Sequence, residues 1–273
     1  MLRLLNRINP LACILAGIMA LCLASLSHAA SPILSRVVDS GVLRVAMSAD
    51  QPPFTMRSRD KSIIGFDVDL AKYLANAMRV QLEIVEKPFG DLLETLAAGE
   101  ADLVISGMTI TPTRTQQVDF IGPYTLSGKS ILTTARIKGV VEDTAVFDHP
   151  EIQVAALENS TSQSFVEREL SRASLHLISN YDQGIQMLLT GRIDAVVADI
   201  PILKLSMLRY PEAGLSMIEP ALSIEPIGIA IPGEDAQFAN LVGNYMDAIE
   251  KTGFIKQLHE KWFEDNNWIM FLP

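Results

Sequence analysis

One arginine stands among small and hydroxylated residues in the stretch SGMTITPTRTQQVDF, residues 106–120. This residue, Arg114, follows a short and mostly apolar run, DLVI, that predicts a buried strand. A guanidinium beside hydroxyl groups and backbone N–H donors can bind a carboxylate through two parallel hydrogen bonds. The alternative is a solvated loop cation, because charged residues are mostly exposed. The remaining sequence has to decide between these roles.

An amino-acid zwitterion needs such a carboxylate site and a second site of opposite charge. On the carboxylate side, Arg114 is expected to act with Thr109 and with the backbone N–H of Gly107. Ser160 and Thr161 lie in a loop before a predicted helix, where free backbone N–H groups form an anion site. These five residues form the candidate carboxylate site.

Asp199 is the candidate partner for the ligand ammonium, because it ends the predicted strand AVVAD. Its other interpretation is a helix N-cap, since Ile200 and Pro201 follow and proline suits the first helical turn. The sequence leaves both roles open. Asparagine also caps helices, so Asp199→Asn is expected to weaken ligand binding and to leave stability nearly unchanged.

Two segments that share one layout indicate how these residues are positioned. Residues 92–107 and 185–199 each contain an amphipathic helix, a glycine, two further residues, an aspartate and a short apolar strand. The glycines are Gly99 and Gly191, and the aspartates are Asp102 and Asp194. Each glycine stands where a helix C-terminus favours left-handed backbone.

A second similarity lies upstream of each copy. VLRVAMSAD (42–50) and IQVAALENS (152–160) are apolar strands that lead into polar loops, and helical patterns follow at about 67–78 and 162–173. The order strand, helix, helix, strand predicts parallel βα units and an open α/β sheet in each of two lobes.

Ligands of open α/β sheets bind beyond the carboxyl ends of the strands. Those ends are residues 48–51 and 106–114 in one lobe, and residues 159–161 and 199 in the other. Gln51 and Ser106 therefore join the candidate ligand-binding residues. Because Arg114 and Asp199 lie on equivalent rims of opposite lobes, we expect a cleft between the lobes.

The N-terminus predicts a secretory signal peptide, residues 1–29. Arg3 and Arg7 precede an apolar run, and small residues follow at the expected cleavage site after Ala29. Both cysteines, Cys13 and Cys22, lie in this segment, so the mature chain is expected to have neither a disulfide nor a thiolate metal site. We expect a periplasmic location.

Composition narrows the possible functions. Without the signal peptide, 20 basic residues stand against 32 acidic ones, which disfavours binding to nucleic acid or to an anionic membrane. The remaining histidines, His149, His176 and His259, are scattered without metal-ligand spacing. No nucleophile elbow and no glycine-rich phosphate loop occur. We therefore expect no metal, no cofactor and no catalytic residue.

Six stretches resemble the periplasmic solute-binding proteins of polar amino-acid ABC transporters, solute-binding protein family 3. They are VLRVAMSADQPPF, GFDVDLAKYLA, SGMTITPTR, VDFIGPYTLSGKS, GRIDAVVADIP and GFIKQLHEKWF, in the family's order. The resemblance implies the type II periplasmic-binding-protein fold, in which two α/β lobes, each an open mixed sheet with flanking helices, are joined by a two-strand hinge. It places lobe 1 at residues 30–130 and 226–273 and lobe 2 at residues 131–225, with crossovers near 127–134 and 223–231.

The resemblance also assigns roles to single residues. It implies that Arg114, with Thr109 and the backbone of Gly107, binds the ligand carboxylate, and that Asp199 binds the ammonium. The family's glycine-threonine-threonine turn falls on Asn159, Ser160 and Thr161, and the residue that cradles the ligand side chain falls on Phe89.

Three positions depart from the family pattern. Asn159 replaces a glycine, although asparagine adopts left-handed backbone more readily than most residues. Gln51 stands where many members have an aromatic residue, and Ser48 stands where some have an aspartate. The missing aspartate disfavours, without excluding, a cationic ligand such as arginine or lysine.

The resulting hypothesis is a monomeric substrate-binding protein of an ABC importer, which captures an amino acid or a similar small acid and delivers it to an inner-membrane permease. An exported cyclohexadienyl dehydratase is the enzymatic alternative, because such enzymes resemble these binding proteins and this chain. Their acid catalyst is a glutamate three residues after the equivalent of Asp199, where this chain has Ile202. A ligand-binding receptor protein is the third possibility.

Overall fold

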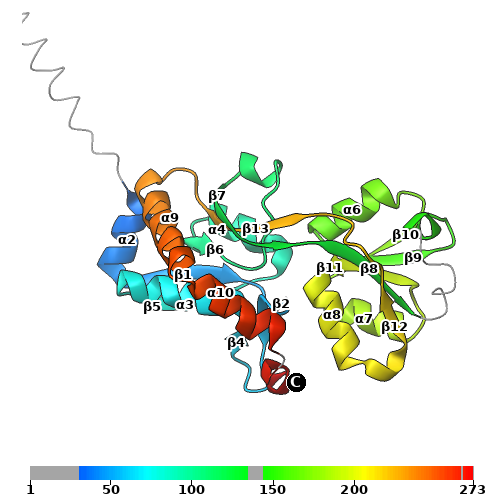
Figure 1. The fold of residues 1–273 in the computed structure, drawn as a ribbon. Coiled ribbons are helices and arrows are strands. Elements are labelled where there is room, and N and C mark those ends of the chain that lie inside the picture. Colours follow the sequence, from blue (N-terminus) through cyan, green and yellow to red (C-terminus); the bar gives the residue numbers. More distant parts are fainter. Residues whose placement is uncertain (1–30, 135–143, 266, 273) are drawn as a thin grey trace, which may run out of the picture.

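The computed structural model describes residues 31–134, 144–265 and 267–272. These residues form two α/β lobes with a five-stranded sheet in each, and strands run from one lobe to the other (Figure 1). The expected two-lobed fold class is confirmed. The predicted signal peptide, residues 1–29, lies outside the described residues.

The sheet of the first lobe has the strand order β5-β1-β6-β13-β7. β1 pairs in parallel with β5 and β6, whereas β13 is antiparallel to β6 and β7. The strands are β1 (Val42–Met47), β5 (Gln81–Glu86), β6 (Leu103–Val104), β7 (Asp119–Ser127) and β13 (Glu225–Ile231). A small second sheet contains β2 (Asp50–Gln51), β3 (Thr55–Arg57) and β4 (Ile63–Ile64). The helices are α2 (Pro32–Ser40), α3 (Phe66–Met78), α4 (Leu92–Ala97), α9 (Ala236–Lys251) and α10 (Phe254–His259).

The sheet of the second lobe has the order β10-β9-β11-β8-β12. Its strands are β8 (Lys129–Thr134), β9 (Gln153–Leu157), β10 (Ser174–Ile178), β11 (Ala195–Asp199) and β12 (Leu215–Met217). Its helices are α6 (Thr161–Glu169), α7 (Tyr181–Leu189) and α8 (Ile200–Arg209). Short 3₁₀ helices occur at Phe89–Asp91, Arg114–Gln116, Thr144–Phe147, Pro211–Ala213 and Asn267–Phe271, and a π-helical turn at Glu260–Glu264.

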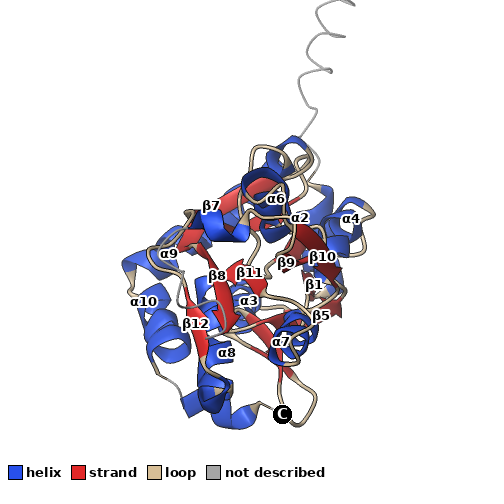
Figure 2. Ribbon diagram, turned by 90° about the vertical axis from the view of Figure 1, so that its right-hand side faces the viewer, coloured by secondary structure: helices blue, strands red, loops and turns tan. Residues whose placement is uncertain are grey.

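Helices cover both faces of the second sheet because its central strands are apolar on both faces. Successive side chains of a strand point to opposite faces. Thus Val197 of β11 packs in one cluster with Phe165 of α6, whereas its neighbour Val196 packs in another with Leu188 of α7. Figure 2, which faces this lobe, shows α6 on one side of the sheet and α7 and α8 on the other.

Two chain segments connect the lobes. β7 continues through Gly128 into β8, and residues 218–224 lead from β12 back to β13 (Figure 1). The crossing segments lie so close together that a Cβ atom on Gly128 would stand 2.7 Å from the Ser223 carbonyl oxygen. Glycine at this point therefore allows the hinge strands to pack side by side.

The repeated glycine and aspartate have matching roles in the two lobes. Gly99 and Gly191 both have positive φ angles after a helix, 71° and 69°, as predicted. Asp102 accepts hydrogen bonds from the backbone N–H of Arg44, and Asp194 accepts one from that of Gln153. Each aspartate thus fixes its helix-to-strand loop to the first parallel strand of its lobe.

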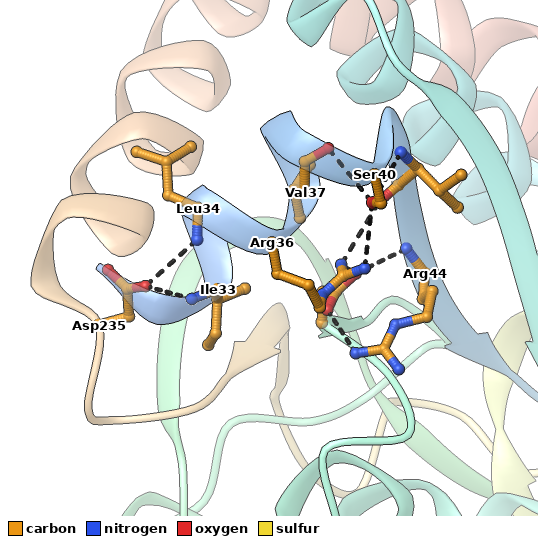
Figure 3. Close-up of polar contacts among 9 residues, drawn as sticks. Ile33, Leu34, Arg36, Val37, Ser40, Arg44 and Asp235 are labelled. Atoms are coloured by element: carbon orange, nitrogen blue, oxygen red, sulfur yellow. Dashed lines mark hydrogen bonds and ion pairs between the residues drawn. The ribbon is translucent and has the colours of Figure 1, made fainter. Parts of the chain in front are cut away.

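Helix α2 is attached to the first lobe at both ends (Figure 3). The carboxylate of Asp235, which caps α9, also accepts hydrogen bonds from the N–H groups of Ile33 and Leu34 (Figure 3). Near the other end, Arg36 pairs with Asp102, the aspartate that also binds Arg44. The chain is therefore fixed to the lobe from its first described helix.

Helix boundaries agree with the sequence in most places. The pattern at 67–78 corresponds to α3, and Gly253, with φ 76°, separates α9 from α10 as expected. The helix expected at 162–173 ends earlier, at Glu169. Leu170 leaves helical geometry and buries its side chain, which turns the chain towards β10.

Candidate functional site

The lobes contact each other in this structure. Gly90 of the first lobe lies so close to Asn159 of the second that a Cβ atom on Gly90 would stand 2.8 Å from Asn159 Nδ2. β2 contacts α7, and one hydrophobic cluster contains both Leu92 of the first lobe and Ile202 of the second. The cleft is therefore closed.

Two of the cavities between the closed lobes lie beside the predicted residues. The first, about 650 Å³, is lined from the first lobe by the loop after β1 and from the second by α7 and α8. The second, about 960 Å³, is lined by the loop that contains Thr109 and Arg114, by the start of α6 and by the hinge residue Glu225. Of the predicted residues, Thr109, Arg114, Ser160 and Thr161 come together in this second cavity.

Arg114 is held at the second cavity by contacts with its own loop and with Phe89. Its Nη1 atom donates to the Thr109 carbonyl oxygen at 2.8 Å, and its guanidinium lies 5.7 Å from the centre of the Phe89 ring. Within the described part of the chain it forms no ion pair. Burial lowers the pKa of Arg114 to about 10, against the opposing effect of Glu225 and Asp199. The guanidinium therefore stays charged at neutral pH and keeps donors for an anion.

The predicted role of the Gly107 N–H is not what the structure shows. This group donates to the fully buried carboxylate of Asp67 at 2.5 Å, and the Tyr124 hydroxyl donates to the same carboxylate at 2.8 Å. Burial raises the pKa of Asp67 to about 7, although both hydrogen bonds oppose the shift. Gly107, with φ 60°, thus shapes the loop and offers no free N–H to a ligand.

Ser160 and Thr161 differ in what they offer to a ligand. The Ser160 hydroxyl caps α6 by accepting from the N–H groups of Ser162 and Gln163, and it donates to the Leu157 carbonyl oxygen. Thr161 makes no hydrogen bond through its N–H or hydroxyl to any described residue, so these donors face the cavity unused. Asn159, with φ 56°, adopts the left-handed backbone expected of it.

Asp199 occupies the N-cap position of α8, but its side chain makes no capping hydrogen bond. Its carboxylate instead accepts from Lys129 Nζ at 2.8 Å, and the same Nζ lies 3.7 Å from Glu225 Oε2. The Lys129 side chain is only 2% exposed. The capping hydrogen bond on which the expectation of unchanged stability rested is absent, and because Asp199→Asn would leave this buried ammonium short of a partner, we now expect the substitution to lower stability.

Sequence reasoning missed Lys129 and Glu225. Each is a single charged residue at the start of an otherwise uncharged strand, in SGKSILTT and SIEPIGIAI, and that pattern is the signal that could have identified them. Ser223 orients Glu225 by donating to Oε1 at 2.7 Å. Lys129, Asp199 and Glu225, which we call the hinge charge cluster, carry one net negative charge.

The remaining predicted residues lie beside these cavities. Phe89 is mostly buried between Pro88, which lines the first cavity, and Gly90, which lines the second. Ser106 is fully buried, and its hydroxyl contacts the backbone N–H and hydroxyl of Ser48 at 3.0 and 3.1 Å. Gln51 is 6% exposed and donates to Asp50 at 3.4 Å. Ser106 therefore positions the loop after β1. Gln51 contacts Asp50, and Asp50 lines the first cavity.

Tyr181 is a buried phenol that is close enough to carboxylates of both lobes for their charges to affect its pKa. It lines the first cavity, and burial together with the nearby charges of Asp199, Asp50 and Glu225 raises its pKa well above the ordinary value. The phenol is therefore neutral at physiological pH.

The described residues contain neither a metal-binding cluster nor a membrane-spanning helix. No group of histidine, cysteine, aspartate and glutamate side chains with metal-binding geometry was found among them. No helix in this part of the chain has the length and apolar character needed to cross a membrane.

Comparison with known proteins agrees with the geometry. The chain is 31% identical over 234 residues to an L-arginine-binding protein of Pseudomonas aeruginosa, covering 81% of this chain and 87% of the relative. It is 26% identical to a cyclohexadienyl dehydratase of the same organism, covering 89% and 92%. A solved binding component of an ABC transporter from Wolinella succinogenes, complexed with lysine, has a TM-score of 0.81 and 30% identity, covering 84% and 99%. Residues 43–265 match the model of the bacterial extracellular solute-binding proteins, family 3, and the chain belongs to that family.

Proposed function

We propose that this protein is the extracytoplasmic substrate-binding component of an ABC importer, and that it captures an amino acid between its lobes. After cleavage of the signal peptide it acts as a monomer in the periplasm and delivers its ligand to an inner-membrane permease. Family membership and relatives that are named for arginine binding or solved with lysine support this proposal.

The observation that carries the proposal is the placement of opposite charges in the cleft. Arg114 presents one partly buried positive charge, and the hinge charge cluster presents one net negative charge. Both carboxylates of the cluster lie close enough to Arg114 to oppose the lowering of its pKa by burial. A zwitterion complements this pair of sites, with its carboxylate at Arg114 and its ammonium at Asp199 and Glu225.

Binding should favour the closed form. Arg114 and Phe89 belong to the first lobe, Thr161 and Asp199 to the second, and Glu225 to the hinge. A ligand that contacts all three parts binds best when they are together, so it shifts the equilibrium between open and closed forms.

A thermal-shift screen of the common L-amino acids and their close derivatives tests the proposal. Stabilisation should follow the ratio of ligand concentration to Kd, and reach about 2.7 kcal/mol at a hundredfold excess over Kd. At least one α-amino acid should raise the melting temperature, with a decrease in the radius of gyration. A screen without any stabilising compound at millimolar concentration would contradict the proposal.

The relative named as a cyclohexadienyl dehydratase supports an enzymatic alternative. At the position that the resemblance assigns to the acid catalyst, this chain has Ile202, which is 2% exposed and cannot donate a proton. Incubation with prephenate or arogenate distinguishes the two functions. We expect no aromatic product, and enzyme-dependent product formation would support the dehydratase instead.

A further inference from the structure

Asp50 is a carboxylate at the first cavity with no cation beside it. It lies in β2, opposite Tyr181 and Asp182 of α7, and all three residues line the cavity. Its carboxylate contacts Gln51, at 3.4 Å, and Ser48, and no basic group in the described part of the chain forms an ion pair with it. Burial and the nearby Asp182 raise the pKa of Asp50.

The cations that line the same cavity are paired with other acids. Arg57 pairs with Glu86, and Arg209 Nη1 lies 2.9 Å from Asp182 Oδ1. Lys87 Nζ lies 2.7 Å from Glu100 Oε2. Asp50 is thus the one acid lining the first cavity that lacks a basic partner among the described residues.

The position of Asp50 relates it to the proposed amino-acid site. Asp50 and Tyr181 line the first cavity together, and the charges of Asp50, Asp199 and Glu225 all act on the Tyr181 phenol. The ion pairs of Arg57, Lys87 and Arg209 are each neutral. The charged groups that remain are Arg114 and Lys129, which are positive, and Asp50, Asp199 and Glu225, which are negative, so they sum to one negative charge. A zwitterion leaves that charge unmatched, whereas an amino acid with a cationic side chain neutralises it.

We propose that the first cavity holds the side chain of a cationic amino acid and that Asp50 accepts hydrogen bonds from its distal guanidinium or ammonium group. This inference rests on the proposed function and names the ligand class of the same cleft. It reverses the expectation drawn from Ser48, because the carboxylate that is missing there is supplied two residues later, with Ser48 as its neighbour. The cavity of about 650 Å³ has room for an extended side chain.

The test compares L-arginine with L-citrulline, which has nearly the same shape but a neutral side chain. Titration calorimetry gives the Kd of each ligand for the wild-type protein and for Asp50→Asn. A hydrogen bond to a charged group is worth about tenfold to hundredfold in affinity. We expect the wild type to prefer arginine by this factor, and Asp50→Asn to lose most of that preference while its Kd for citrulline changes less than about threefold.

Glu86→Gln is the matched control. Glu86 lines the same cavity, but it is paired with Arg57 and is 46% exposed, so its loss should leave the arginine preference within about twofold. Binding of citrulline shows that each variant is folded.

A wild type that binds citrulline as tightly as arginine, or an Asp50→Asn variant that keeps the full preference, would overturn the inference. Binding of neutral amino acids alone would refute the cationic ligand and leave the proposed function standing. A protein that binds no amino acid at all would refute both.

Discussion

Replacing Arg114 by methionine should weaken binding of the ligand carboxylate more than any other single substitution in the second cavity. The guanidinium is partly buried, one of its nitrogens is fixed on the Thr109 carbonyl oxygen, and its remaining donors have no described partner. Removing one member of a buried charge pair costs about 2–5 kcal/mol, much of it from the group left unpaired. The Kd should therefore rise roughly thirtyfold to several-thousandfold.

Arg114→Lys should recover only part of this loss. An ammonium keeps the charge but cannot form two parallel hydrogen bonds with one carboxylate. Arg168→Met serves as the control, because Arg168 lines the same cavity but is exposed and pairs with Glu169. Its Kd should stay within about twofold of the wild type.

The decisive assay is a thermodynamic cycle in which the Arg114 side chain and the ligand carboxylate are changed separately and together. Titration calorimetry measures the amino acid and its carboxamide against the wild type and against Arg114→Met. The carboxamide should bind the wild type far more weakly, yet lose little more in the variant, because both changes remove the same contact. If the two losses simply add, Arg114 does not bind the ligand carboxylate.

Three further predictions concern neighbouring residues. Asp199→Asn should weaken α-amino-acid binding and also lower the free energy of unfolding, by up to about 3–5 kcal/mol, since Lys129 keeps only the more distant Glu225; a variant that binds and unfolds like the wild type in urea titrations would contradict this. Gly90→Ala should raise the Kd severalfold and leave stability nearly unchanged, because its Cβ meets Asn159 only when the lobes close; scattering curves showing ligand-induced compaction equal to that of the wild type would refute the steric argument. For Asp67, the folded-state pKa of about 7 lies above the ordinary 3.8, so its stabilising contribution is complete below about pH 4 and is lost as the pH rises through 7. Relative to Asp67→Asn, the wild type should therefore lose on the order of a few kcal/mol of unfolding free energy over this window, and parallel pH profiles of the two proteins would show that Asp67 has no such pKa.

The parts of the fold that depend on local sequence could be predicted. Gly99 and Gly191 end helices, and the period of the apolar residues identifies α3 and α9, because these properties depend on neighbours along the chain. Asn159 has the left-handed backbone expected of asparagine. Strand ends identified Arg114 and Thr161 as residues at equivalent rims of the two lobes, and both line the second cavity.

The polar contacts that depend on distant segments could not be predicted. Lys129 and Asp199 are 70 residues apart, and their pairing follows from the antiparallel register of β8 and β11. The Gly107 N–H is bound by Asp67 across 40 residues, which removes a donor that the motif alone offers to the ligand. Spacing along the chain predicts which residues lie at the carboxyl ends of the strands. The hydrogen-bond or ion-pair partner of each residue depends instead on how the sheets and the hinge are packed.

A crystal structure of the mature protein, grown with the amino acid that gives the largest thermal shift, tests the central claim most directly. The ligand should lie between the lobes, with its carboxylate within hydrogen-bonding distance of the Arg114 guanidinium and its ammonium within the same distance of Asp199 or Glu225. Lys129 should remain paired with one of these carboxylates. A ligand bound outside the cleft, or one inside it whose carboxylate lies away from Arg114, would contradict the account.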